Sequence, residues 1–252
     1  MLQELLELNI FAFFLIFARI GTAMVFLPGF SAAYVSTLLR LGIALAISFL
    51  VLPTLARDLP LPPNSAFELA NMMGAEILVG AFIGLIMRIM ISALQTAGTI
   101  AALASSMANA LINDPIADQQ SSTISGFLLT TAIVLIFVSD MHHLMLRAVV
   151  ESYVMFVPGS ELPIGDFANA IGRQVADSFA LGLQLSAPFL VVGLTYYIGL
   201  GLIGRLMPAL PVFFFGLPVQ ITVQLMMFTI TLTGIMLAFI QNFQSSLGRF
   251  VQ

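Results

Sequence analysis

The chain has 252 residues, of which 60% are hydrophobic and only 8% are charged, whereas charged residues make up about 25% of an ordinary soluble domain. A water-soluble fold of this length would lack the polar residues needed to cover its surface. The basic residues are all arginine, and there is neither lysine nor cysteine. These absences exclude a Walker lysine, a lysine Schiff base, a disulfide and a thiolate ligand. The net charge of −4 argues against a nucleic-acid partner.

The first residues carry Glu4 and Glu7 and lack the basic region of a cleavable signal peptide. The first apolar segment is therefore expected to be retained.

Long uncharged stretches follow along the whole chain, and one of them runs from Leu206 to Gly248. Several exceed the roughly 18 to 20 residues that a helix needs to cross a bilayer core. Helix is the expected structure, because in lipid each backbone amide has to be paired within its own segment. We therefore predict an all-α, polytopic membrane protein. About six apolar segments are expected: Asn9–Leu27, Leu38–Leu55, Met72–Ala97, Ser125–Met155, Phe179–Leu206 and Val212–Ile240.

Proline and glycine separate these segments. Pro53 lies at the end of the second, and Pro158-Gly159 follow the fourth. Such residues end helices or permit turns, so they predict the connections. Pro208 and Pro211 predict a tight reversal between the last two segments, which we expect to form an antiparallel hairpin that docks on a similar hairpin of a partner.

The stretch from Ser105 to Ser122 interrupts the apolar middle of the chain. The dipeptide Asp114-Pro115 disfavours a helical conformation at the preceding Asn113, and the Gln/Ser cluster that follows the dipeptide is typical of a loop. We expect the third helix to end before this loop and a new helix to begin near Thr123. A solvent-exposed connector is one interpretation. The apolar part from Met107 to Ile112 is unusual for such a connector and favours packing against something.

Small residues recur at helical spacing. Gly80 and Gly84 form a G-x-x-x-G step, and Gly42 and Ala46 form a similar step. This spacing permits close approach of helix backbones, either within one bundle or between subunits. The sequence leaves both interpretations open. A third group lies at one end of the fifth segment: Gly199, Gly201 and Gly204.

Three charged residues lie inside apolar segments: Arg19, Glu76 and Arg88. An ionised group at the bilayer centre costs roughly 2.5 to 3.5 kcal/mol. Two interpretations compete, a polar pathway through the protein and pairing inside a protein assembly. Pairing is favoured, because the repeated acidic relay of a proton-coupled carrier is absent. Two further pairs lie four residues apart and predict local helix ion pairs: Arg147 with Glu151, and Arg173 with Asp177.

The only histidines, His142 and His143, follow Asp140. Adjacent helical residues point about 100° apart, so a shared metal is not expected, and a polar helix end capped by Asp140 is the simpler interpretation. A triad of Ser122, His143 and Asp140 can be drawn, but no G-x-S-x-G motif supports it. Asp140 and Asp177 flank different segments, which gives no facing carboxylate pair. We therefore predict no catalytic residue, no metal and no cofactor.

Two groups of short motifs lie in the central and C-terminal parts of the chain. In chain order they are Gln95–Gly98, Asn113–Pro115, Phe137–His143, Pro158-Gly159, Leu200–Pro208, Val212-Phe213 and Gly216–Pro218. In order and spacing, and together with the chain length and the apolar segments, they resemble the FliR family of flagellar and type III secretion export-gate proteins.

The resemblance implies a non-enzymatic subunit of a helical export gate in the bacterial cytoplasmic (inner) membrane, at the flagellar basal body. It implies FliP, FliQ, FlhB and FlhA as membrane partners, and exported flagellar proteins in transit. Residues 1–165 would resemble FliP in fold, and residues 166–252 would form a hairpin that resembles FliQ.

The resemblance also identifies Met107–Ser122 as the plug of the export channel. A segment with apolar and Met side chains can exclude water, and its small residues let it move aside. The expected plug residues are Met107, Asn109, Leu111, Ile112, Asn113, Asp114, Pro115, Gln119, Ser121 and Ser122. The expected residues of the assembly hairpin turn are Gly201, Gly204, Arg205, Pro208, Pro211 and Pro218.

A secondary transporter for a small solute is the alternative function, because charges lie within apolar segments and prolines interrupt them. Such a carrier would be stable alone, whereas an export-gate subunit would co-purify with partners. An intramembrane hydrolase would need Ser122, His143 or Asp140. The arginines give no bias between loops, so the membrane orientation stays open.

Overall fold

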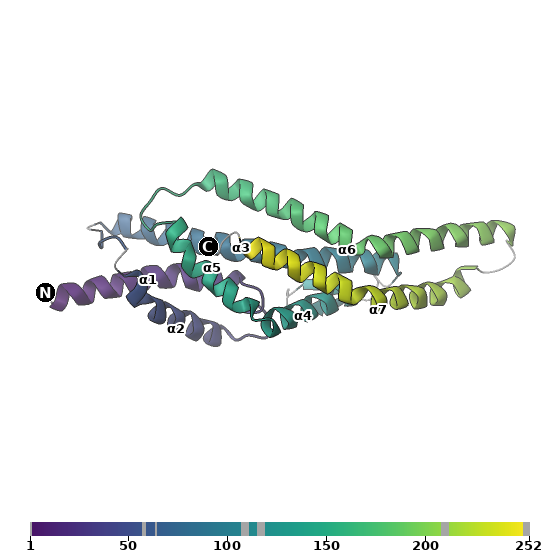
Figure 1. The fold of residues 1–252 in the computed structure, drawn as a ribbon, viewed down its shortest axis with the longest axis horizontal. Helices are drawn as coiled ribbons and strands as arrows, with labels where there is room; N and C mark the ends of the chain where they lie inside the picture. Colours follow the sequence, from purple (N-terminus) through teal and green to yellow (C-terminus); the bar gives the residue numbers. More distant parts are fainter. Residues whose placement is uncertain are drawn as a thin grey trace. The chain divides into compact units, whose positions relative to one another are not determined.

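The computed structural model describes residues 2–56, 59–63, 65–106, 111–114, 119–207 and 212–248. Within these ranges the backbone forms helices and one short antiparallel strand pair (Figure 1). The prediction of a helical protein is confirmed, with the strand pair as the exception. The elements are α1 (Leu2–Phe26), α2 (Thr37–Leu55), α3 (Ala66–Ala104), β1 (Leu111–Asp114), β2 (Gln119–Ser122), α4 (Thr123–Val138), α5 (Met141–Met155), α6 (Ile164–Leu206) and α7 (Val212–Leu247).

The helices carry the lengths and composition of membrane spans. Four of the described segments are long and apolar enough to cross a bilayer, in α2, α3, α6 and α7, and the bent pair α4–α5 would add a fifth. The predicted polytopic membrane protein is thereby confirmed.

The fourth predicted segment is broken rather than continuous. α4 and α5 meet at an angle of 76° around Ser139 and Asp140. Asp140 has a left-handed backbone with φ of +57°, a conformation that a right-handed helix cannot contain but that Asp tolerates. Pro53, in contrast, does not end its helix and lies inside α2.

The described chain divides into two compact units. The first comprises Met1–Met90, Ile136–Gln174 and Gln244–Gln252, and the second comprises Ile91–Leu135 and Val175–Phe243. In the first unit α1 and α2 lie side by side (Figure 1).

The Gly80/Gly84 step packs α3 on α1 within this chain. A Cβ atom at Gly80 would collide with the carbonyl oxygen of Arg19, and one at Gly84 would lie 2.7 Å from Phe26 Cβ. Glycine is needed here because the backbones approach too closely for any side chain. Other glycines face open space, with nothing within 4 Å of a Cβ built on them: Gly42, Gly199, Gly201 and Gly204.

A buried ion pair lies beside this contact. Arg19 on α1 and Glu76 on α3 are only 1% and 2% exposed, and Arg19 Nε lies 2.6 Å from Glu76 Oε2. A second bond joins Arg19 Nη2 to Glu76 Oε1 at 3.0 Å. The arginine is therefore held by both oxygens of one carboxylate, the geometry that makes such pairs strongest.

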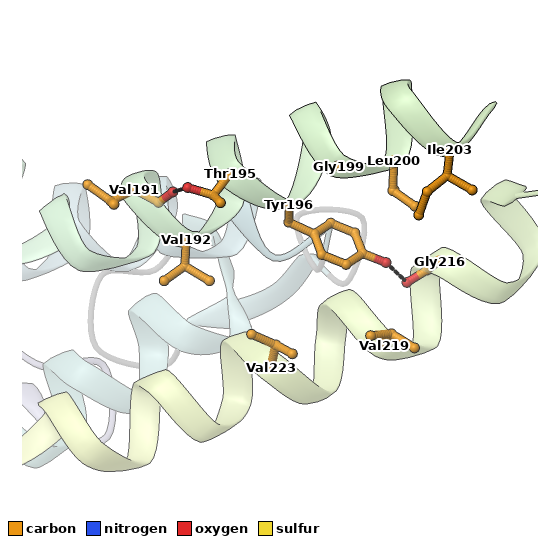
Figure 2. A pocket seen from close by; sticks show the side chains of 10 residues that line it. All are labelled: Val191, Val192, Thr195, Tyr196, Gly199, Leu200, Ile203, Gly216, Val219 and Val223. Carbon is orange, nitrogen blue, oxygen red and sulfur yellow. Dashed lines mark hydrogen bonds between the residues drawn. The ribbon is translucent and has the colours of Figure 1, made fainter. Parts of the chain in front are cut away.

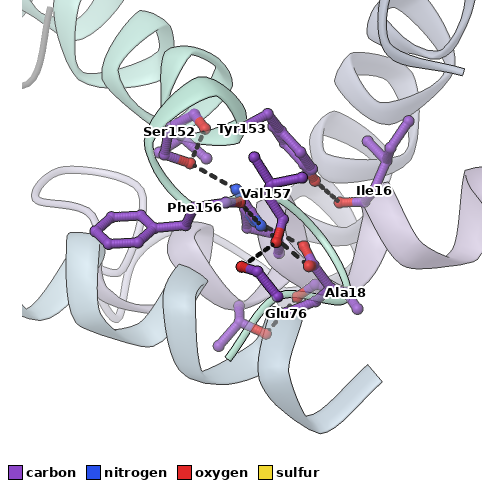
Figure 3. A network of polar contacts seen from close by, with 11 residues as sticks. Ile16, Ala18, Glu76, Ser152, Tyr153, Phe156 and Val157 are labelled. Carbon is purple, nitrogen blue, oxygen red and sulfur yellow. Dashed lines mark hydrogen bonds and ion pairs between the residues drawn. The ribbon is translucent and has the colours of Figure 1, made fainter. Parts of the chain in front are cut away.

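The end of α5 completes the cluster. Arg19 donates to Ser152 Oγ at 3.1 Å and to the carbonyl oxygen of Phe156 at 2.8 Å. Its guanidinium carbon lies 3.8 Å from the centre of the Tyr153 ring. Figure 3 shows Glu76 of α3 and the α5 residues Ser152 and Tyr153 converging on this point. Both charges are paired inside one chain, so they form no open polar pathway in this structure.

The other predicted charges behave differently. Arg88 is exposed on α3. Arg147 and Glu151 form the predicted ion pair at 2.5 Å. The prediction for Arg173 is wrong, since among the described contacts its Nε donates to the carbonyl oxygen of Asn169 at 3.4 Å rather than to Asp177.

Replacing Glu76 with Ala should destabilise the protein strongly, because it leaves the Arg19 charge buried without its partner. The expected loss is about 3 to 5 kcal/mol, measured as thermal unfolding in mild detergent. Arg147→Ala is the matched control, because this exposed pair contributes at most about 1 kcal/mol. Replacing both Arg19 and Glu76 with Met should recover much of the loss. Equal unfolding temperatures for Glu76→Ala and Arg147→Ala would contradict this prediction.

Candidate functional site

The central stretch between α3 and α4 contains a strand pair where the sequence predicted a loop. β1 and β2 pair antiparallel, with Leu111 opposite Ser122 and Asp114 opposite Gln119. The strands form because pairing satisfies backbone N–H and C=O groups that an apolar environment would leave unpaired. We call β1, β2 and the chain between them the central hairpin. Met107, Asn109 and Pro115 lie outside the described residues.

A two-stranded hairpin is only marginally stable alone, and this one is anchored at its C-terminal end, while other contacts fix the end of α3 that precedes it in the chain. At its C-terminal end Ser122 accepts a hydrogen bond from the Ser125 backbone N–H at 3.2 Å, as an N-cap of α4 does. The Ser125 hydroxyl donates to the carbonyl oxygen of Gln95 at 2.9 Å. A Cβ at Gly98 would lie 2.5 Å from Ser125 Cα. The motif Gln95–Gly98 therefore holds the start of α4 against α3.

The last turn of α3 and the two residues after it are also fixed by contacts. The Ala104 carbonyl oxygen accepts a hydrogen bond from Gln220 Nε2 of α7 at 2.8 Å. Ser106 and Tyr197 of α6 share a hydrogen bond between their hydroxyl oxygens at 3.0 Å. A Cβ at Gly193 would lie 3.3 Å from Ala104 Cβ, so glycine brings α6 close to this point.

Gln220 and Gln224 are residues that sequence reasoning missed. They are 1% and 2% exposed in an otherwise apolar helix. Gln224 Nε2 donates to the carbonyl oxygen of Phe189 at 3.2 Å, while the side-chain oxygens of both residues have no hydrogen-bond partner among the described residues. Polar residues inside apolar helices are costly and mark functional positions. Their signal in the sequence is the spacing of four residues within an uncharged run.

The second-unit parts of α6 and α7 form an antiparallel pair. Tyr196 Oη donates to the Gly216 carbonyl oxygen at 2.5 Å. Both residues line an apolar cavity of about 780 Å³ between the helices (Figure 2). Val191, Val219 and Val223 line the same cavity.

The predicted turn residues occupy different places in this pair. Gly201, Gly204 and Arg205 lie in the last turns of α6, and Pro218 lies inside α7. Pro208 and Pro211 lie outside the described residues.

The side chains of His142 and His143 lie together, although adjacent helical residues were expected to point in different directions. The ring centres of His142 and His143 are 4.1 Å apart, and the His142 ring stacks on Phe137. His143 Nδ1 lies 3.6 Å from Asp140 Oδ1, and the three residues offer ligand atoms within 4.8 Å of one another. Yet Asp140 and His143 are exposed, and the cluster lies at the N-terminus of α5, where the helix dipole disfavours a cation.

The serine of the triad that can be drawn from Ser122, His143 and Asp140 has another role in the structure. The Ser122 hydroxyl is engaged at the start of α4, where it also donates to the carbonyl oxygen of Gly98 at 3.4 Å. The structure therefore gives this serine an anchoring role.

Comparison with known proteins supports the resemblance that the motifs indicated. Residues 10–246 match the family described as bacterial export proteins, family 1. The flagellar biosynthetic protein FliR of Caulobacter vibrioides is 30% identical, over 94% of both chains. FliR of Bacillus subtilis is 31% identical, over 89% of this chain and 87% of its own.

A translocation protein has a similar identity to this chain. The Yop proteins translocation protein T of Yersinia pestis is 31% identical, over 87% of this chain and 85% of its own. The match to the family covers α1 from residue 10 and nearly all of α7, and therefore both compact units with the anchored central hairpin between α3 and α4. The chain belongs to the bacterial export proteins, family 1.

Proposed function

We propose that this chain is a non-enzymatic subunit of a flagellar-type (type III) protein export gate in the bacterial inner membrane, and that its central hairpin closes the channel for unfolded proteins. The family match over residues 10–246 carries the export role. The relatives include both a flagellar biosynthetic protein and a Yop translocation protein, so the proposal is stated for the export system that the two have in common.

The anchoring of the central hairpin supports its role as a plug. Ser122 and Ser125 fix its C-terminal end on α3, and Gln220 with Tyr197 fix the end of α3 that precedes it. A paired ribbon between fixed helices can be displaced as a unit, because its backbone groups stay paired while the helices keep their places. We propose that Leu111 and Ile112 supply the apolar seal that excludes water.

Two other function classes have less support. A carrier would place the charged residues of its membrane segments along the path of its substrate, yet Arg19 and Glu76 form an ion pair with each other in a buried cluster. A hydrolase would need the Ser122 hydroxyl, which caps α4.

The proposed partners are membrane subunits of the FliP, FliQ, FlhB and FlhA types, together with exported flagellar proteins in transit. We extend the proposal to the chain's two parts, with residues 1–165 taking a FliP-like place and residues 166–252 a FliQ-like place in the assembly. Exposed glycines on α6 support such contacts, since Gly201 and Gly204 leave room for a close helix from outside the chain.

Affinity isolation of the tagged chain from native membranes in mild detergent tests this function. We expect several apolar membrane proteins of the export apparatus to co-purify, identified by mass spectrometry. A stable monomer or dimer that purifies without them would favour a carrier instead.

Replacing Gly201 or Gly204 with Leu should abolish co-purification of the partners and leave insertion and thermal stability of the chain unchanged. The reason is that a side chain at either position meets no atom of this chain but would block a close helix–helix contact. Gly182→Leu is the contrasting variant on the same helix, because its Cβ would lie 2.8 Å from the Ala93 carbonyl oxygen, so it should unfold the chain itself. Full assembly of both Gly201→Leu and Gly204→Leu would refute the docking role.

Deleting Asn109–Ile112 should make the assembled gate leak small ions, because it removes the apolar part of the plug. The measurement is membrane conductance or small-solute uptake in cells that express the variant with its partners. Assembly is verified by co-purification in the same cells. A surface connector would tolerate this deletion, so unchanged permeability in an assembled gate would remove the plug role and leave a structural one.

A further inference from the structure

An apolar groove of about 530 Å³ runs along the first unit, between α1, α2 and α3. It extends along α1 from Phe14 to Phe26, a length of about 18 Å at 1.5 Å per residue. Met73 and Ile77 of α3 form one wall, and Leu41 of α2 forms the other. The hydroxyl of Thr22 inside it is engaged by the carbonyl oxygen of Ala18 on its own helix. The groove is therefore a slot for hydrocarbon.

The dimensions of the groove select the kind of occupant. Its volume spread over about 18 Å gives a mean cross-section of about 30 Å². A long and narrow apolar slot of this kind suits a single extended hydrocarbon chain. The length also matches the depth of one leaflet, about 15 Å of a hydrocarbon core about 30 Å thick.

One end of the groove carries a positive charge. Arg40 lies there beside Thr37, in the first turn of α2. Its Nε donates to the carbonyl oxygen of Phe30 at 2.9 Å, and its Nη2 donates to that of Ala32 at 3.4 Å. These bonds fix the guanidinium, while no described residue accepts a hydrogen bond from Nη1. The first turn of α2 contains no acidic residue, so nothing on this helix neutralises the charge.

We propose that this groove binds one anionic phospholipid, with an acyl chain in the slot between α1 and α3 and the phosphate on Arg40. The chemistry of the two ends determines this assignment. The apolar walls accept the acyl chain, and the fixed guanidinium of Arg40 binds the phosphate. The inference is independent of the proposed export function, since it depends only on the first unit.

The test uses the full chain, with the membrane subunits that purify with it, and two photoreactive lipids. Phosphatidylglycerol and phosphatidylcholine carry the same acyl chain with a diazirine near its end, and labelled peptides are identified by mass spectrometry. We expect label on α1 and α3 peptides that line the groove. Phosphatidylglycerol should label them about fivefold more than phosphatidylcholine, the effect of one interfacial arginine.

Arg40→Gln should remove this preference, and Arg40→Lys should retain most of it, because charge rather than the carbonyl bonds selects the headgroup. Gly21→Leu should block labelling by both lipids, since a side chain there fills the groove and meets only the Phe17 ring. The matched controls are Arg173→Gln on α6 and Gly42→Leu on α2, which should label as the unaltered chain does.

Equal labelling by the two lipids in the unaltered chain would overturn the proposal, and so would a preference that survives Arg40→Gln. Absence of label from the groove peptides, with a partner subunit cross-linked there instead, would show that protein covers the groove and would also overturn it.

Discussion

The pairing of Arg19 with Glu76 is the interaction on which the first unit depends. Two charges 57 residues apart meet at 2.6 Å with almost no exposure, and a buried pair is stable only when its geometry and its additional hydrogen bonds are nearly complete. Gly80 supplies the condition for this, because it lets the α3 backbone touch α1 beside Arg19. Ser152 and the Phe156 carbonyl then bring in α5. The ion pair therefore specifies how three helices meet.

The second unit applies the same principle with uncharged groups. Three buried or part-buried polar side chains of this unit, Ser125, Gln220 and Gln224, bond to the backbone of a neighbouring helix. Gln220 holds the end of α3, and Ser125 holds the start of α4. One contact precedes the central hairpin in the chain and the other follows it, so the element proposed to move lies between two fixed helix ends. This arrangement reconciles a rigid membrane bundle with a displaceable closure.

The glycines of this chain occupy two kinds of surroundings. At Gly80 and Gly182 the space for a side chain is occupied by neighbouring backbone of this chain, whereas Gly201 and Gly204 face open space. Buried glycines are therefore part of the fold, and exposed ones on an apolar helix are available to other subunits. The groove beside Arg40 adds a third class of contact, with lipid. One apolar sequence can thus encode packing against itself, against partners and against the membrane.

The sequence by itself determined the helical membrane class, the start of α4 at Thr123 and the family, because apolar run lengths, proline and short motifs are local signals. It did not determine the break at Asp140, the pairing of Leu111 with Ser122, or the burial of Gln220 and Gln224. Whether Arg19 was paired, and whether a glycine step faced the chain or its surroundings, was likewise decided only by tertiary structure. The physical reason is that hydropathy reports how much surface a segment must bury, while partners far away in the chain decide which atoms bury it.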